Sequence, residues 1–285
     1  MRNHTRLIRY TRRMLLCPVR GCHVALARDG RRLHCPRAHS FDIASSGYVN
    51  LLQPQDRRSK QPGDAALAVA ARRRLHDRGV TAPLLAAIAE TLGASSTDIV
   101  LDAGCGEGYY LGSLATQTGC DAHGADISTP AIEAAAKRYP ECHWIVANAD
   151  RWLPYADQSF SIVLSVTARM NGAEFRRVLR DGGRLLVAVP SPVDLGELRG
   201  SGRDRTAYAI KTFEPHFTLV EQRSVTTTAN LDAAAVRDVL VSIYRPMQSQ
   251  PPIAMRVTFG LDLLLFRSQR TETVDPPEVR ASHQD

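Results

Sequence analysis

The chain has 285 residues, of which 44% are hydrophobic and 23% charged, and its formal net charge is +7. This length is enough for one full α/β core and a smaller second module. No apolar run approaches the roughly 20 residues that a membrane-spanning helix needs. The composition therefore excludes a membrane-spanning protein, and we expect a soluble chain with no membrane partner.

Positive charge is concentrated at the N-terminal end. Residues 1–78 hold 17 Lys and Arg against 5 Asp and Glu, a net of +12, so the remaining residues carry −5. This asymmetry indicates a polyanionic partner, because Lys and Arg contacts to phosphates dominate nucleic-acid affinity. The Arg-rich start has only a short apolar stub at residues 14–16, too short for a secretory signal. We therefore expect a cytoplasmic protein that keeps this segment.

A cluster of cysteines follows, spaced Cys17-x4-Cys22-x12-Cys35-x3-His39. Three thiolates and one imidazole make a tetrahedral structural zinc set, with two close pairs forming two turns that clamp one ion. His23 could replace Cys22 as a ligand. The alternative is a group of buried thiols with solvated histidines and no metal.

After this module, the chain changes to helical and then to alternating composition. Residues 64–78 and 81–92 have an Ala/Leu/Arg-rich helical composition, broken by Gly79. From Asp98 onward, strands and helices alternate in the α/β manner. The expected strands are residues 99–104, 122–127, 143–149, 160–166 and 184–190, with helices near 109, 130–139 and 174–179. Two β-rich runs, 217–228 and 255–266, flank a last helix at 232–240.

The stretch LDAGCGEGYY, residues 101–110, places Gly104, Gly106 and Gly108 after an apolar strand, preceded by Asp102. This G-x-G-x-G spacing differs from the G-x-G-x-x-G of dinucleotide sites. Asp126 ends the next strand, 18 residues beyond Gly108. Glycines let a backbone approach its ligand closely. A carboxylate at a strand end can accept two ribose hydroxyls, and Asp102 could meet an ammonium group, so the pattern suits an adenosine joined to an amino acid.

The pattern resembles the class I S-adenosylmethionine-dependent methyltransferases, whose first strand ends in D-x-G-x-G-x-G. This resemblance implies a Rossmann-like, seven-stranded, mostly parallel sheet with S-adenosyl-L-methionine as cofactor. The end of the third strand would contact the adenine, with Asp150 as a further option there. The expected cofactor-binding residues are Asp102, Gly104, Cys105, Gly106, Gly108, Asp126, Ile127, Asn148 and Ala149.

Residues 35–52, CPRAHSFDIASSGYVNLL, narrow the resemblance further. They are similar to the bacterial 23S rRNA (guanine-N1-)-methyltransferase family, which opens with a zinc module ending in C-x3-H-x-F-D and a GYVNLL segment. The stretch PGDAALAVAARRRLHDRG and the segment AAAKRYP also match. The resemblance implies methylation of N1 of a guanine in a 23S rRNA hairpin near the peptide exit tunnel. Some members of the family confer resistance to macrolides.

Three departures from the family fall on the acceptor side. The turn after the fourth strand reads VTARMNG where the family has an aromatic-Ala-Pro turn, the last helix gives VSIYRPM, and the first zinc turn is two residues longer. The resemblance therefore leaves the acceptor open between rRNA and a small molecule of a biosynthetic pathway. A non-catalytic RNA-binding or assembly factor is a third alternative. Such a factor would tolerate erosion of the glycine turn, whereas the turn is intact in this sequence. Candidate catalytic residues by position are Arg169, Asn171, Tyr48 and Asn50.

The predicted fold is thus an α/β class I methyltransferase with a small N-terminal zinc-binding domain. We expect a basic, RNA-facing zinc module over residues 1–60 and a helical linker over 61–95. The methyltransferase domain would follow over 96–270, with a disordered tail at 271–285. The expected metal ligands are Cys17, Cys22, Cys35 and His39. The expected partner is a 23S rRNA hairpin, and the sequence leaves a homodimer open.

Overall fold

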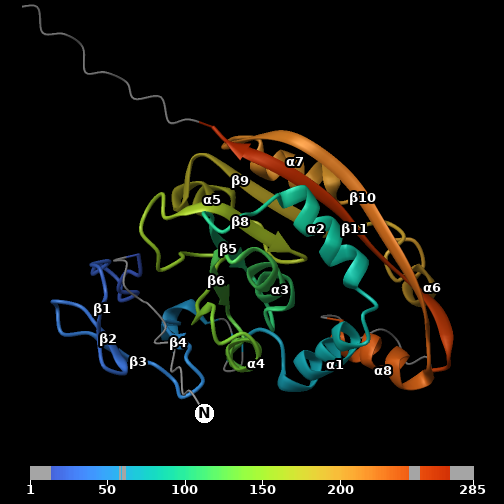
Figure 1. Ribbon diagram of the computed structural model, residues 1–285, viewed down its shortest axis with the longest axis horizontal. Helices are drawn as coiled ribbons and strands as arrows, with labels where there is room; N and C mark the ends of the chain where they lie inside the picture. Colours follow the sequence, from blue (N-terminus) through green and yellow to red (C-terminus); the bar gives the residue numbers. More distant parts are fainter. Residues whose placement is uncertain (1–13, 58, 60–61, 244–250, 270–285) are drawn as a thin grey trace, which may run out of the picture.

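The computed structural model describes residues 14–57, 59, 62–243 and 251–269, which form a small and a large sheet (Figure 1). The strands are β1 (Ala27–Asp29), β2 (Arg32–His34), β3 (Ser40–Asp42), β4 (Val49–Asn50), β5 (Ile99–Ala103), β6 (Asp121–Asp126), β7 (His143–Val146), β8 (Phe160–Val166), β9 (Leu179–Pro190), β10 (Phe217–Leu231) and β11 (Met255–Ser268). The helices are η1 (Pro54–Asp56), α1 (Ala66–Asp77), α2 (Ala82–Leu92), α3 (Tyr109–Thr118), α4 (Thr129–Arg138), α5 (Gly172–Val178), α6 (Gly196–Arg199), α7 (Thr206–Phe213) and α8 (Ala233–Ser242).

The large sheet has the strand order β10-β11-β9-β8-β5-β6-β7-β4. Pairings from β9 through β4 are parallel, while β11 pairs antiparallel with both β9 and β10. The chain runs outward from β5 to β7 and then returns to the other side of β5 at β8. This reversal creates a crevice at the carboxyl ends of the central strands, where open α/β sheets bind their ligands. The predicted seven-stranded, mostly parallel sheet is confirmed as β5 to β11.

An eighth strand, β4, comes from the N-terminal segment. Val49 and Asn50 pair in parallel with Ile145 and Val146 of β7, and Val49 is fully buried. The module has a second attachment, because the Leu16 N–H donates to the Pro154 carbonyl at 2.9 Å. The small sheet β1-β2-β3 therefore lies beside the β4 edge, while β10 and β11 curve along the opposite edge (Figure 1).

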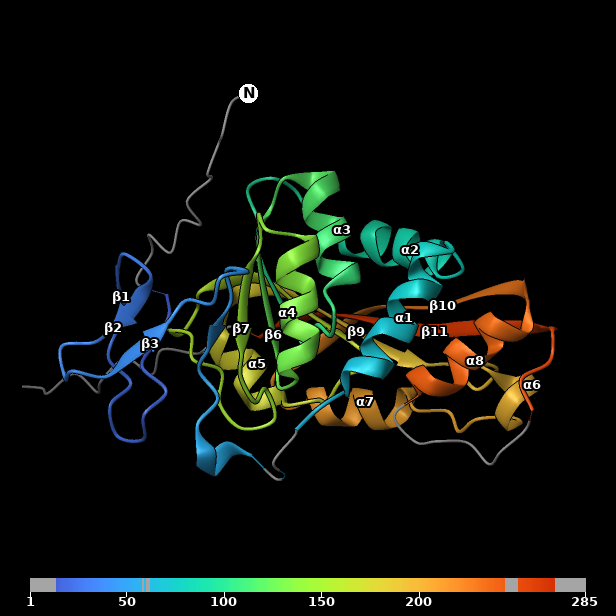
Figure 2. The same ribbon diagram turned by 90° about the horizontal axis from the view of Figure 1, so that it is seen from below.

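Helices cover both faces of the large sheet. On one face α2, α3 and α4 bury apolar side chains such as Ile88, Leu111 and Ile132. On the other face α5 and α7 bury Phe175 and Phe213 in a second apolar cluster, which also contains Leu15 of the N-terminal module. Helix α1 runs between α4 and α8 (Figure 2). No helix among the described residues is long and apolar enough to cross a membrane.

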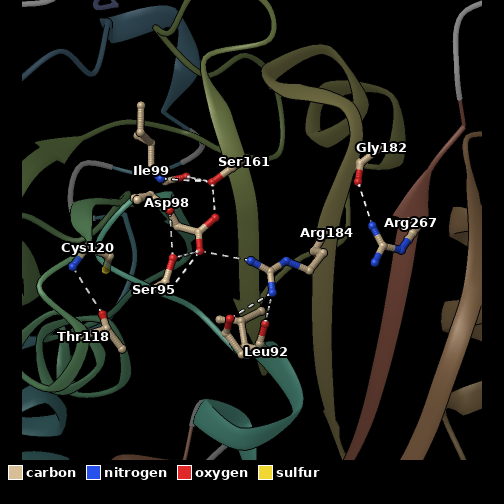
Figure 3. Close-up of polar contacts among 12 residues, drawn as sticks. Leu92, Ser95, Asp98, Ile99, Thr118, Cys120, Ser161, Gly182, Arg184 and Arg267 are labelled. Carbon is tan, nitrogen blue, oxygen red and sulfur yellow. Dashed lines mark hydrogen bonds and ion pairs between the residues drawn. The ribbon is translucent and has the colours of Figure 1, made fainter.

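A polar network fixes the amino end of β5 (Figure 3). The Asp98 carboxylate accepts from the Ser161 hydroxyl at 2.8 Å, the Ser95 N–H at 2.9 Å and the Arg184 guanidinium at 3.1 Å. Arg184 also donates to the Leu92 carbonyl at the end of α2 at 2.6 Å. Burial opposes ionisation of Asp98, but these hydrogen bonds and the Arg184 charge lower its pKa. The network ties α2, β5, β8 and β9 together at the end of the sheet away from the glycine turn.

The predicted linker helices and the first four predicted parallel strands are present within a few residues of their expected bounds. The fifth, predicted over 184–190, begins five residues earlier as β9, so the expected turn at 181–183 lies within the strand. The two β-rich runs form β10 and β11, and the last predicted helix is α8. The sequence did not indicate the short strands of the module, nor α6 and α7. The predicted tail at 271–285 lies outside the described residues, and the domain boundaries stay a prediction.

Candidate active site and metal centre

The glycine turn lies at the carboxyl end of β5, where all three glycines have positive φ. The angles are 92° at Gly104, 54° at Gly106 and 77° at Gly108, a region that other residues rarely adopt. A Cβ on Gly104 would lie 2.4 Å from the Ala168 Cβ, and one on Gly108 would lie 2.5 Å from the Trp144 ring. A Cβ on Gly106 would meet nothing nearer than 4.0 Å. Gly104 and Gly108 are therefore required for close packing, whereas the backbone at Gly106 is accessible to a ligand.

Asp126, at the end of β6, holds the turn in place. Its Oδ2 accepts from the Gly106 N–H at 2.9 Å and its Oδ1 from the Ser128 N–H at 2.8 Å. Burial raises the pKa of Asp126, although both hydrogen bonds favour its ionised form. A carboxylate has about four lone-pair positions, so each oxygen can still accept another donor. The geometry thus combines a structural role for Asp126 with the predicted acceptance of ribose hydroxyls.

Asp102 is the last charged residue of β5 and is 1% exposed. Among the described residues, its Oδ1 has no hydrogen-bond partner. Burial, followed by the nearby charges of Asp126 and Glu107, raises the pKa of Asp102 well above its usual range. A buried carboxyl oxygen without a donor costs free energy, and a bound ammonium group or hydroxyl would supply that donor. S-adenosylmethionine carries both groups and a positive sulfonium, so the residues present fit this cofactor.

A second acidic residue within the turn, Glu107, anchors it to α1. Its Oε2 accepts from Arg72 Nε at 2.9 Å, and its Oε1 lies 3.1 Å from His76 Nε2. Burial opposes ionisation, but the His76 hydrogen bond and the Arg72 charge lower the pKa of Glu107 to about 2. Arg72 also pairs with Asp64, and the His76 ring stacks on Tyr109 at 3.8 Å. This network was not predicted from the sequence, where its signal is a charged residue between two glycines of a buried turn.

The segment between the zinc module and α1 lies along the ends of β6 and β7. Ser128 donates its hydroxyl to the Asp64 carbonyl at 2.7 Å, and Asn148 donates its amide to the Asp56 carbonyl at 2.9 Å. Gly63, at φ 80°, lies so close to Ser128 that a Cβ would come within 2.7 Å of it. The segment therefore borders the predicted cofactor site on the side of β6 and β7.

The residues predicted to lie near the adenine and the acceptor fall in two places in the structure, one near the glycine turn and one at the edge of the large sheet. Asn148 and Ala149 follow β7, and the Ala149 carbonyl accepts from Asn171 at 3.2 Å. Arg169 is 70% exposed in the loop after β8, 3.5 Å from Asp150, and the adjacent Ala168 lies against the glycine turn. Through Ala168 the loop after β8 reaches Gly104. The remaining predicted cofactor positions, Cys105 and Ile127, lie just after the ends of β5 and β6.

The other two catalytic candidates lie at the sheet edge. Tyr48 precedes β4 and Asn50 belongs to it, with β6 and β7 separating that strand from β5. Burial raises the pKa of Tyr48, with Glu133 of α4 acting in the same direction. The Asn50 side chain accepts from the Leu52 N–H at 3.1 Å. Their roles stay a prediction, and their present contacts are structural.

The four predicted zinc ligands converge in the N-terminal module. The Cys22 and Cys35 sulfurs are 3.8 Å apart, and His39 Nδ1 lies 3.4 Å from both Cys17 and Cys35. A tetrahedral ion with Zn–S near 2.3 Å and Zn–N near 2.0 Å would place such ligands roughly 3.5–3.8 Å apart. The set therefore fits one zinc ion.

Two neighbouring groups support this ligand choice. His23 stacks on Trp152 at 4.2 Å and lies outside the converging set, which favours Cys22 over His23 as the ligand. Burial opposes ionisation of both buried thiols and raises the pKa of Cys17, whereas backbone N–H groups lower the pKa of Cys35 to about 6 and so favour the thiolate that zinc requires there. These observations favour a metal over the alternative of buried thiols.

The fold, the glycine turn and the acidic residues around it define a class I S-adenosylmethionine-dependent methyltransferase with an N-terminal zinc ribbon. Residues 100–186 match the family described as "Methyltransferase domain", and residues 15–60 match the zinc-ribbon family described as "RlmA, N-terminal". The chain belongs to the 23S rRNA (guanine-N1-)-methyltransferase family.

The relatives support that assignment. A Streptomyces fradiae protein named 23S rRNA (guanine(748)-N(1))-methyltransferase is 37% identical over 240 residues, 80% of this chain and 84% of the relative. A Micromonospora griseorubida protein, whose name assigns it provisionally as a 23S rRNA (guanine-N(1)-)-methyltransferase, is 38% identical over 204 residues. The match covers 65% of this chain and 68% of the relative. A chain of the solved Haloferax volcanii complex with the Trm112 methyltransferase activator shares the fold at TM-score 0.52 and 19% identity, covering 72% of this chain and 96% of that one.

Proposed function

We propose that the protein transfers a methyl group from S-adenosylmethionine to N1 of a guanine in 23S rRNA. The observation that carries the proposal is the 37% identity to the S. fradiae enzyme over 80% of this chain and 84% of that enzyme. The separate family matches to the ribbon and to the methyltransferase domain agree with it. The attachment of the ribbon to the large sheet through β4 adds support. An RNA held by the ribbon would lie beside the sheet that carries the glycine turn.

The donor is bound by the residues around the glycine turn. When bound, S-adenosylmethionine supplies an electrophilic methyl group on a positive sulfur. Gly106 would allow close approach, Asp126 would accept from the ribose, and Asp102 would receive the ammonium group. Because Asp102, Asp126 and Glu107 lie near one another, their field favours the cationic donor over the product, which has lost the sulfonium charge.

The acceptor would approach over residues 167–171, the loop against Gly104. A guanine in a hairpin must leave its stack to reach a buried donor. Its N1 proton has to pass to a base such as water as the methyl group arrives. Negative charge builds on O6 to the extent that the proton leaves ahead of the methyl transfer. The exposed Arg169 guanidinium is suited to stabilise that charge, while Asn171 caps α5 by accepting from the Glu174 N–H at 3.3 Å and so fixes the loop.

The basic surface of the ribbon would hold the RNA. Its exposed cations include Arg20, Arg31, Arg32 and Arg37. Arg57, in the segment leading to α1, is also exposed; Arg58 and Lys60 lie outside the described residues. Each phosphate contact contributes close to one unit to the slope of log affinity against log salt. Neutralising Arg57, Arg58 and Lys60 together should therefore weaken RNA binding and flatten the slope without changing cofactor affinity.

The test is transfer of labelled methyl groups to transcripts of 23S rRNA hairpins, followed by reverse transcription. A methyl group on N1 blocks the Watson–Crick edge, so the reverse transcriptase should stop beside one guanine. The double variant Arg31→Gln/Arg32→Gln should lose most transfer, whereas Arg267→Gln, an exposed arginine on the far strand β11, should keep it. An enzyme with full cofactor affinity that labels no transcript would contradict the proposal.

A second candidate, methylation of a small molecule, is favoured by the VTARMNG loop, which departs from the family pattern on the acceptor side. Its signature would be turnover that survives the ribbon variants and forms no salt-dependent RNA complex.

Because the proposed substrate is rRNA, we also propose that the protein is cytoplasmic and that its activity is linked to macrolide-type resistance. Drug susceptibility of cells with and without the gene checks the resistance, and light scattering decides between a monomer and a homodimer.

A further inference from the structure

A second group of metal-ligating side chains lies outside the active site and the zinc ribbon. Asp121 and His123 are two residues apart on β6, so both point to the same face of the sheet. His143 of β7 is the direct parallel partner of His123. The strand pairing therefore fixes one carboxylate and two imidazoles side by side, at the amino ends of these strands and away from the glycine turn at their carboxyl ends.

The distances within this trio suit a metal ion. Asp121 Oδ1 lies 3.2 Å from His123 Nε2 and 3.4 Å from His143 Nε2. The three ligand atoms all lie within 4.8 Å of one another. A tetrahedral ion with bonds of about 2.0–2.1 Å to nitrogen and oxygen separates its ligands by roughly 3.3 Å. Both separations from Asp121 are close to that value, and the two histidine nitrogens lie within 4.8 Å of each other.

The surroundings position the imidazoles and leave access for an ion. His123 and His143 stack at 4.4 Å, and the His123 ring lies edge-on to Tyr155 and Phe160, at 5.7 and 5.4 Å. Both histidine side chains are at least nine-tenths buried, whereas that of Asp121 is 41% exposed. An ion can therefore enter beside Asp121, and water can complete its coordination.

We propose that Asp121, His123 and His143 bind one divalent first-row transition-metal ion, with zinc as the ordinary occupant. Two imidazoles and a carboxylate are ligands for zinc and for its first-row neighbours, whereas calcium and magnesium prefer sites made of oxygen. The ion would join β6 to β7 beneath Tyr155, which forms a β-bridge with Leu15 at the attachment of the zinc ribbon. Its place gives it a structural role and keeps it out of the methyl transfer.

The experiment is a metal titration of the full-length chain after chelation and refolding in reductant, with Zn²⁺ and with Co²⁺ as probes. The wild type should bind two equivalents. The Co²⁺ form should show a thiolate charge-transfer band from the ribbon and, with the second equivalent, additional d–d absorption without further charge transfer. Asp121→Asn and His143→Gln should each bind one equivalent with the charge-transfer band unchanged. Asp181→Asn is the matched control, because this carboxylate has a similar exposure of 40%, and it should bind two equivalents.

The partly exposed Asp121 is the safer variant if His143→Gln does not fold, and S-adenosylmethionine affinity monitors folding in each protein. A wild type that binds a single equivalent would overturn the proposal and leave a hydrogen-bonded trio. So would a second equivalent that persists in Asp121→Asn with unchanged affinity.

Discussion

The glycine turn and the zinc ribbon are two small irregular regions that depend on different forces. The turn follows β5, whose five residues are all buried, and it is held by the hydrogen bond from the Gly106 N–H to Asp126 and by close packing against Trp144 and Ala168. The ribbon has three strands of three residues each, and the buried Cys17 and Cys35 belong to its core. A large sheet can support the turn without an ion, whereas the ribbon uses a metal in place of a larger core.

The two regions are not independent, because β4 carries the ribbon into the large sheet. Loss of the ribbon should therefore remove one edge strand and expose β7, but leave β5, β6 and the turn in place. This difference orders the effects that we expect from substitutions.

The largest effect should follow loss of a zinc ligand. Structural zinc contributes an apparent binding free energy of about 10–16 kcal/mol, so Cys35→Ser should unfold the ribbon and abolish methylation of RNA. Hydrogen exchange should become fast from the first described residues through β4 and stay slow in β5 and β8. His34→Ala, an exposed histidine next to the ligand, should leave zinc content and exchange unchanged. A variant that lacks zinc but keeps an ordered ribbon would contradict this account.

A substitution inside the turn should cost less and act on the cofactor. Gly104→Ala combines a strained backbone at φ 92° with a Cβ 2.4 Å from Ala168, a destabilisation of about 2–4 kcal/mol. Calorimetry should show S-adenosylmethionine affinity reduced by at least about tenfold. Gly182→Ala has a similar positive φ of 69° and no atom near its Cβ, so it isolates the backbone strain. Equal cofactor affinity in the two variants would remove the packing argument.

The Glu107 network should make the free energy of unfolding depend on pH, by an amount comparable to the destabilisation expected for Gly104→Ala. The folded pKa of Glu107 is about 2 and its ordinary value 4.5, so its stabilisation is complete above pH 4.5 and is lost as the pH falls toward 2. The difference corresponds to about 3 kcal/mol. The free energy of unfolding of wild type and Glu107→Gln, measured by urea titration, should differ most at neutral pH and converge in acid. A constant difference at every pH would mean that the variant acts through packing alone.

The smallest of these effects should come from Asp126→Ala. It removes the acceptor of two backbone N–H groups and of the proposed ribose hydroxyls, at a cost on the order of 1–3 kcal/mol. Both thermal stability without cofactor and cofactor affinity should fall, because Asp126 holds the turn as well as the ligand. Unchanged affinity by calorimetry would exclude Asp126 from the cofactor site.

The sequence predicted the central sheet because apolar strands and glycine-rich turns are local signals. It could not place β4: a two-residue strand shows no alternation, and only its pairing with β7 identifies it. Glu107 and Arg72 lie 35 positions apart, and His123 and His143 lie on different strands, so only folding brings these pairs together. The cysteine spacing, by contrast, was local enough to predict the four groups that converge in the ribbon.

The central claim is that this chain methylates one guanine of 23S rRNA at N1. The most direct test is mass mapping of nuclease fragments of 23S rRNA from cells with and without the gene, complemented by the wild type and by Gly104→Ala. In the presence of the wild type, one fragment should be heavier by a single methyl group, with a reverse-transcription stop at its guanine. Cells that carry the Gly104→Ala variant should lack both the heavier fragment and the stop. Identical fragments from all four strains would contradict it and would favour a small-molecule acceptor.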